Sequence, residues 1–227
     1  MSAPEMQRLR IAYAHGEPVK FISHLDVLRT WHRAIRRAEL PLTYSAGFSP
    51  HPRLLFASPL PVGVTGDWEL VDIYLDNRMD ADEATKRLDA QFPFGMDVRG
   101  VHEVPLNSSS LPSLMRYADY VVLLEERMPE GELDARIQRL LAAENLPRER
   151  RRDKDVRRYD LRPLIVDLPN ALWRKDVIRL QMRLRCDSSA AGRPEEVTAA
   201  LGFQERPQTI HRLGLILATP EETFKTA

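Results

Sequence analysis

A basic stripe is predicted on the segment that follows Ser23. Arg29, Arg33 and Arg37 recur four residues apart, so on a helix they share one face, with Asp26 at its start and Arg36 beside it. Guanidinium groups at this spacing suit the phosphates of a nucleic acid or another anionic partner. The alternative is an ordinary solvated helix face, and both interpretations stay open.

A second group with chemical potential lies in the segment 44–53. It combines Tyr44, Phe48, His51 and Arg53 with glycine and proline residues that turn and stiffen the backbone. Aromatic rings beside cations are typical of surfaces that stack nucleobases and bind the neighbouring phosphates. The alternative is that Tyr44 and Phe48 fill the core beneath this loop.

Histidines supply the candidate acid–base groups, because the imidazole titrates near neutral pH. His24 follows a predicted N-cap at Ser23, where the helix dipole disfavours the charged ring, and His51 lies in the loop. A histidine in a first helical turn is more often structural than catalytic. His24, Asp26 and His51 match no recognised ligand motif, so no metal is predicted.

The second half of the chain has its own charged segments. Asp160 and Arg162 interrupt an apolar run at a spacing of two, so on a strand they would share one face and either pair or hold a ligand. The segment 148–158 mixes both charges, which favours a solvated hairpin. Arg212, in the last predicted strand, is a further cation that strand alternation could direct to solvent.

The elements that position these groups follow the order β-α-β-β-α-β in residues 1–108. The first helix begins after the N-cap Ser23 and buries Leu25, Leu28, Ile35 and Ala38. The second helix begins after Asp80. Strands are predicted at 9–14, on both sides of the loop within 42–61, at 68–75 and at 96–104.

The polar, proline-bearing segment 106–113 separates two halves of similar length. The order β-α-β-β-α-β then repeats, with strands at 117–124, 159–166, 177–185 and 209–217 and helices at 131–144 and 194–201. We therefore predict an α+β protein of two tandem ferredoxin-like domains with mainly antiparallel sheets, at residues 1–108 and 114–227.

Several runs of residues carry a resemblance to a known family. FISHLDVLR at 21–29, RAIRRA at 33–38, LPLTYSAGFSPHPR at 40–53 and FASPLPVG at 56–63 resemble the bacterial radical-SAM-linked protein family, a domain of unknown function. YDLRPLI at 159–165, RPEEV at 193–197 and RLGL at 212–215 match more loosely. Members of that family stand beside or are fused to cobalamin-binding radical SAM proteins, so the resemblance implies such a protein as partner.

The composition limits the chemistry that this chain can perform alone. Its 227 residues include 33 basic and 33 acidic side chains and one cysteine, Cys186, which we expect in a buried strand or at a strand end. One cysteine excludes an internal disulfide and the three-cysteine cluster motif of a radical enzyme, so no cofactor is expected. Without an apolar run of about 18–20 residues or an apolar start, we expect a cytoplasmic protein that spans no membrane.

These observations predict a non-catalytic companion of a radical SAM enzyme that binds or presents RNA. Residues 20–53 support this because they carry six basic and only two acidic residues on a neutral chain. The predicted substrate-binding residues are Arg29, Arg33, Arg37, Tyr44, Phe48, His51, Arg53, Asp160 and Arg162. Two alternatives stay open: a metal-independent RNA endonuclease with His24 or His51 as base, and an adaptor whose basic face docks on the radical SAM enzyme.

Overall fold

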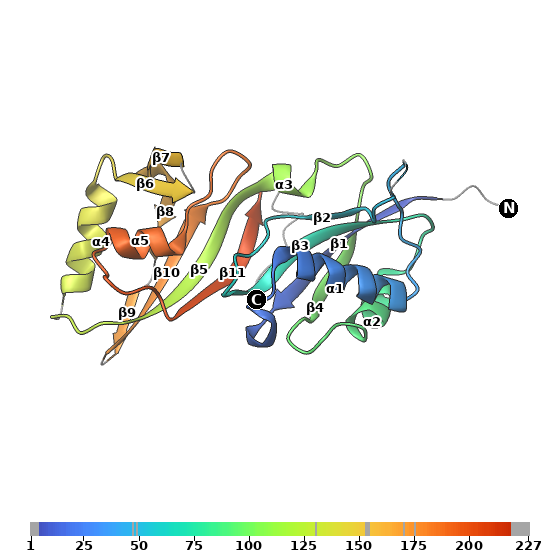
Figure 1. Ribbon diagram of the computed structural model, residues 1–227, viewed down its shortest axis with the longest axis horizontal. Helices are drawn as coiled ribbons and strands as arrows, with labels where there is room; N and C mark the ends of the chain where they lie inside the picture. The colour runs from blue at the N-terminus through green and yellow to red at the C-terminus, as the bar shows by residue number, and fades with distance from the viewer. Residues whose placement is uncertain are drawn as a thin grey trace. The chain divides into compact units, whose positions relative to one another are not determined.

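The computed structural model describes residues 5–46, 48, 50–129, 131–152, 155–169, 171–174 and 176–218. The protein is a mixed α+β structure with mostly antiparallel sheet, which confirms the predicted class (Figure 1). The described part of Met1–Met115 with Gly214–Ala227 forms one compact unit, and Arg116–Leu213 forms the other. None of the helices in the described part of the chain has both the length and the apolarity needed to span a membrane.

The first unit contains an antiparallel sheet in the strand order β4-β1-β3-β2. Its strands are β1 (Gln7–His15), β2 (Leu54–Phe56), β3 (Val64–Leu75) and β4 (Val98–Val104). Its helices are η1 (Glu17–Val19), α1 (His24–Arg37), α2 (Ala81–Asp89) and α3 (Leu111–Leu114). The predicted N-cap Asp80 is confirmed, because its carboxylate accepts hydrogen bonds from the backbone N–H groups of Asp82 and Glu83.

Helices α1 and α2 pack against one face of this sheet. Alternation along β1 directs Leu9, Ile11 and Tyr13 to that face, where they join the buried side chains of both helices. The Trp31 ring packs edge-to-face on Tyr13 at 5.0 Å and on Phe92 at 4.7 Å between centroids. Trp31 therefore anchors α1 on the sheet.

The buried face of α1 differs from the prediction at its first turn. Leu25 was expected to be inward, but its side chain is 63% exposed, so that prediction is wrong. Val27, Trp31, Ala34 and Ala38 are buried at spacings of four, three and four. Leu25 lies outside this stripe, because a residue two positions before Val27 projects from another side of the helix.

The other face of β1 carries a buried ion cluster that sequence reasoning missed. Arg8, Arg10 and Asp72 are each at most 1% exposed. Arg8 donates from Nε and Nη2 to Asp72 Oδ2 at 3.0 and 2.6 Å, and Arg10 Nε donates to Asp72 Oδ1 at 2.8 Å. Arg8 also donates to the carbonyls of Ser108 and Ser109, which fixes the segment after β4 to the sheet.

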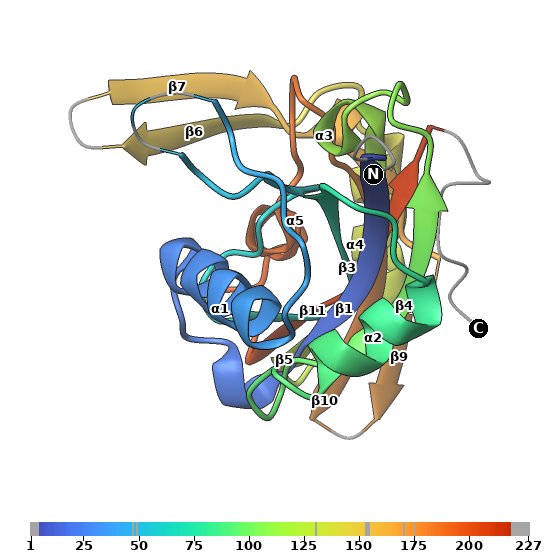
Figure 2. The ribbon, with the colours of Figure 1, turned by 90° about the vertical axis from the view of Figure 1, so that its right-hand side faces the viewer.

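The second unit has the strand order β11-β5-β10-β8, with β9 also paired to β10. Its strands are β5 (Met115–Glu125), β8 (Ile165–Asp167), β9 (Ala171–Arg174), β10 (Val177–Arg185) and the part of β11 (Thr209–Leu217) up to Leu213, and its helices are α4 (Glu132–Ala142) and α5 (Pro194–Ala200). Strands β6 (Pro147–Arg152) and β7 (Asp155–Asp160) form a separate antiparallel hairpin (Figure 2). Cys186 is buried directly after β10, as expected.

The strand predicted at 159–166 is wrong. Strand β7 ends at Asp160, the short helix η2 (Arg162–Leu164) follows, and β8 begins only at Ile165. Asp160 Oδ1 accepts hydrogen bonds from the backbone N–H groups of Leu146 at 2.7 Å and Arg162 at 3.0 Å, which favours a turn over a continuous strand.

Replacing Asp72 by asparagine should destabilise the protein by about 3–5 kcal/mol, because two buried guanidinium groups lose their carboxylate. Urea unfolding followed by tryptophan fluorescence measures the change. Glu83→Gln is the control, since it removes an exposed helical pair with Arg87 and should cost less than about 1 kcal/mol. Equal effects of the two substitutions would contradict the importance of the buried cluster.

Candidate functional site

The start of α1 is set by a side-chain cap. Ser23 Oγ accepts a hydrogen bond from the backbone N–H of Asp26 at 3.3 Å and donates one to Asp26 Oδ2 at 2.7 Å. The predicted cap is confirmed. With its start capped and its apolar stripe on the sheet, α1 turns its arginines outward.

The stripe on α1 consists of exposed guanidinium groups. Arg29 pairs with Asp26 at 3.0 Å, while Arg33 Nε donates to the Arg29 carbonyl at 3.3 Å. Arg37 Nη2 donates to the Gln91 carbonyl at 2.7 Å, just after α2. Within the described part of the chain, Arg33, Arg36 and Arg37 have no carboxylate partner. Most of the positive charge of the stripe is therefore available to an external anion.

The loop 44–53 leaves and rejoins the edge of the sheet. The Ser45 N–H donates to the His51 carbonyl at 2.8 Å, and the His51 N–H donates to Ser45 Oγ at 3.0 Å. Two strands were expected within 42–61, but only β2 forms, and Leu42 and Tyr44 make isolated bridges. Gly47 and Ser49 lie outside the described residues.

The aromatic residues of the loop do not fill the core. Tyr44 is 53% exposed and Phe48 is fully exposed. The interpretation in which both rings fill the core beneath the loop is therefore excluded. An exposed ring of this kind offers a flat face to a base or to an apolar partner.

Arg53 is held at the foot of the loop by an aromatic ring. Its guanidinium carbon lies 4.1 Å from the centroid of the Tyr74 ring. A guanidinium group in such a cation–π contact can still donate hydrogen bonds to an anion.

The foot of the loop lies within electrostatic reach of α1. Burial lowers the pKa of His32, and the charge of His51 lowers it further, which indicates that the two rings are near each other. Arg29 and Arg36 are three and four residues from His32, so they are its neighbours on the helix. Sequence reasoning gave His32 and Arg36 little weight, although their spacing from Arg29 could have identified them.

His24 lies against the aromatic core. Its ring makes an edge-to-face contact with Phe56, with the centroids 5.4 Å apart. Burial lowers the pKa of His24, so the neutral ring is favoured at neutral pH. The contact with Phe56 and the half-buried position agree with a structural role at the edge of the core.

The candidate residues of the second unit, Asp160, Arg162 and Arg212, are distant from α1 and the loop 44–53 in the sequence. The contacts of Asp160 and Arg162 stabilise the local fold. Arg162 donates from Nε and Nη2 to the Leu141 carbonyl at the end of α4 and from Nη1 to the Ile165 carbonyl. Asp160 accepts hydrogen bonds from the backbone N–H groups of Leu146 and Arg162, so its contact with Arg162 is to the backbone. Arg212 is 1% exposed, so alternation does not direct it to solvent.

The fold and this surface define an α+β protein with an arginine-rich helix beside an aromatic loop. Residues 8–194 match the family DUF2344, described as an uncharacterized protein conserved in bacteria, and the chain therefore belongs to that family. The match includes α1, the loop 44–53 and the hairpin β6–β7. No curated protein matches the chain. Among the described residues, no three metal-ligating side chains form a cluster.

Lowering the pH through 6.5, the ordinary pKa of histidine, should weaken folding through His24. Burial lowers the pKa of the folded state, so the unfolded chain takes up the proton first and is favoured as the pH falls. An NMR titration should place the His24 midpoint below the ordinary value, and His24→Gln should reduce the pH dependence of unfolding. A midpoint at or above that value would contradict the burial of the ring.

Proposed function

We propose that α1 and the loop 44–53 form a binding surface for single-stranded RNA. In this proposal the phosphates are contacted by five arginines: Arg29, Arg33, Arg36, Arg37 and Arg53. Tyr44 and Phe48 stack on bases, and His51 donates hydrogen bonds. The observation that carries the proposal is the excess of exposed, unpaired guanidinium groups on α1 beside an exposed aromatic loop. Asp160 and Arg162 are left out because their hydrogen bonds go to the backbone.

A comparison within the chain supports this interpretation over a solvated helix face. On α2, Arg87 pairs with Glu83 at 2.6 Å, and on α4, Arg136 pairs with Glu132 at 2.9 Å. Helix α1 instead carries four arginines and a single acid, Asp26. Like charges at this spacing destabilise a helix, so their accumulation is better explained by an anionic partner.

We also propose that the protein is a non-catalytic companion of a cobalamin-binding radical SAM protein. Support comes from the runs at 21–29 and 40–53, which resemble the radical-SAM-linked family and coincide with the proposed surface. In this arrangement the partner performs the chemistry, and this chain presents the RNA.

Each unit is proposed to be ferredoxin-like. In the first unit, the element order β-α-β-β-α-β and the antiparallel strand order β4-β1-β3-β2 support this assignment. In the second unit, the strand order β11-β5-β10-β8 supports it, with β6–β7 as an insertion after α4.

Neutralising the stripe should weaken RNA binding. The triple variant Arg29→Gln, Arg33→Gln, Arg36→Gln keeps Arg37, which bonds the Gln91 carbonyl, and should lower the affinity for a labelled single-stranded RNA at least about tenfold. The plot of log affinity against log salt concentration has a negative slope, and the magnitude of this slope should decrease by about two. Each of the three lost phosphate contacts contributes about 0.7 to that magnitude. Fluorescence anisotropy at several salt concentrations measures both.

The matched control is Arg87→Gln, Arg127→Gln, Arg139→Gln, which removes the same charge from other exposed positions and should leave the salt slope nearly unchanged. If the stripe variant folds and keeps full affinity, the RNA proposal is wrong. An adaptor function would then be favoured. Phe21 and Leu25, at the start of α1, are 73% and 63% exposed and offer apolar contacts to a protein partner, while the arginines of α1 suit an acidic surface on that partner.

Truncating Phe48 should separate binding from stability. Phe48→Ala should weaken RNA binding by about fivefold to over a hundredfold, the range for loss of one base stack, and leave the melting temperature unchanged because the ring is fully exposed. Anisotropy and thermal unfolding provide the two readouts. Phe56→Ala is the contrasting variant, since this ring packs on Trp31 and its loss should lower the melting temperature. Unchanged RNA affinity in Phe48→Ala would exclude stacking by this ring.

A further inference from the structure

The hairpin β6–β7 sorts its mixed charges by face. Arg148 and Arg150 are two residues apart on β6, so they share one face, and the register places Tyr159 opposite Arg148 on that face. Glu149 lies on the other face, where it pairs with Arg158 at 2.7 Å. The acid that interrupts the basic run therefore neutralises the outer face only.

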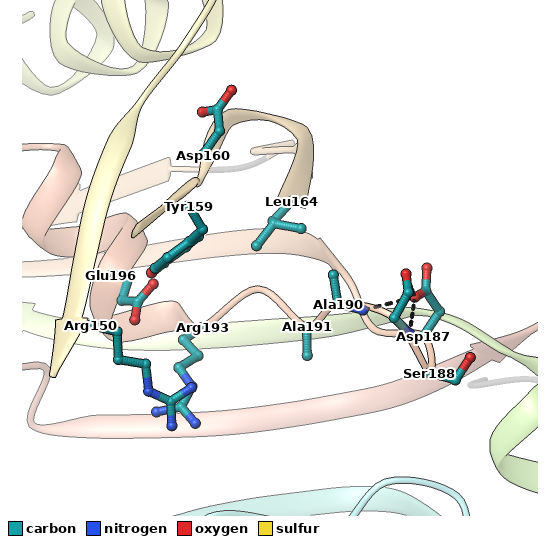
Figure 3. A pocket seen from close by; sticks show the side chains of 11 residues that line it. Arg150, Tyr159, Asp160, Leu164, Asp187, Ser188, Ala190, Ala191, Arg193 and Glu196 are labelled. Carbon is teal, nitrogen blue, oxygen red and sulfur yellow. Dashed lines mark hydrogen bonds between the residues drawn. The ribbon is translucent and has the colours of Figure 1, made fainter. Parts of the chain in front are cut away.

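The inner face of the hairpin borders a pocket of about 370 Å³ within the second unit. Arg150 and Tyr159 come from the hairpin, Arg193 and Glu196 from the start of α5, and the turn 187–191 closes another side (Figure 3). A neighbouring hollow of about 330 Å³ shares Tyr159 and Glu196 and adds Arg148. This volume is in the range of sites for small organic ligands.

Two guanidinium groups line this pocket. They belong to Arg150 and Arg193, and neither side chain has a hydrogen bond or ion pair with any residue that the structure describes (Figure 3). Burial lowers the pKa of Arg193, and the charge of Arg150 lowers it further, while the charges of Glu195 and Tyr120 oppose this shift. The two like charges repel each other, and an anion bound between them would remove that repulsion.

Two carboxylates of the pocket are already occupied by internal hydrogen bonds. Asp187 accepts from the backbone N–H groups of Ser189 and Ala190 at 2.8 and 3.0 Å and from Arg185 Nε at 2.5 Å. Asp160 holds backbone N–H groups, and its carboxylate points away from the arginines in Figure 3. Neither acid therefore neutralises the arginine pair.

Glu196 is the remaining acid in the wall. Its carboxylate makes no hydrogen bond to the described residues, and burial raises its pKa although Arg150 and Arg148 oppose that rise. Within the lining of the pocket itself, Arg150 and Arg193 face one carboxylate that has no hydrogen bond within the described part of the chain, and Glu195, which lines the neighbouring hollow, is a further acid near Arg193.

We propose that this pocket binds a phosphomonoester dianion. Two guanidinium groups supply two positive charges and several in-plane N–H donors, which match a phosphate dianion better than a single carboxylate. The Tyr159 ring and Leu164 provide an apolar wall for the organic part of the ligand. The proposal does not depend on RNA binding by α1, because its residues belong to the second unit.

Calorimetric titration of the full chain with adenosine 5′-monophosphate, and with adenosine as the neutral comparison, tests the proposal. The monophosphate should bind and adenosine should not, and Arg150→Gln or Arg193→Gln should weaken binding by about tenfold to a hundredfold. Arg158→Gln is the matched control on the outer face of the same hairpin and should leave the affinity unchanged. Circular dichroism shows whether each variant is folded.

Two RNA probes that differ only in a 5′-phosphate or a 5′-hydroxyl identify the source of the phosphomonoester. A preference for the 5′-phosphate that Arg150→Gln abolishes assigns the pocket to an RNA end, and stronger binding of the free monophosphate assigns it to a small molecule. Either result supports the proposal. It is overturned if neither phosphate probe binds, if adenosine binds equally well, or if folded Arg150→Gln and Arg193→Gln variants keep the affinity of the unmodified protein.

Discussion

Strand β1 is the element on which the first unit depends, because both of its faces are buried by different kinds of contact. One face packs Leu9, Ile11 and Tyr13 against α1 and α2, and the other pairs Arg8 and Arg10 with Asp72 of β3. Two guanidinium groups around one carboxylate stabilise the fold only while all three groups are present. The bonds from Arg8 to the carbonyls of Ser108 and Ser109 extend this constraint to the chain that leaves the sheet.

Many arginines of the described residues pair with carboxylates, but those of α1 after Arg29 and those of the pocket beside β6–β7 have no such partner among the residues that the structure describes. Pairs such as Arg87–Glu83 and Arg183–Asp119 are joined at 2.6 and 2.7 Å, as expected for a protein with equal numbers of acids and bases. What distinguishes the unpaired arginines of α1 and of the pocket beside β6–β7 is that each group gathers several guanidinium groups on one helix or in one hollow. An exposed ion pair contributes little to the stability of a protein. The gain in stability from pairing therefore does not explain where the unpaired arginines lie.

The elements were easier to predict from the sequence than the sites. Periodicity placed β10 and β11 correctly, and the predicted caps of α1 and α2 are confirmed, because these signals are local. The strand predicted at 159–166 is wrong because the Asp160 side chain bonds the backbone of Leu146, a contact that local alternation does not reveal. The pocket that Arg150 and Arg193 line was equally hidden, since folding joins residues from separate elements.

The use of arginine in place of lysine fits the chemistry proposed for both sites. A guanidinium group can pack its flat face on a ring and still direct its N–H groups sideways to an anion, and the Arg53 guanidinium carbon lies 4.1 Å from the centroid of the Tyr74 ring. An ammonium group has no such separation between a packing face and a donor edge. Arg53 can therefore be fixed in place before any ligand binds, which lowers the entropy lost on binding. Within the proposed surface, Arg53 is thus the cation of the loop 44–53 that its contact with Tyr74 preorganises.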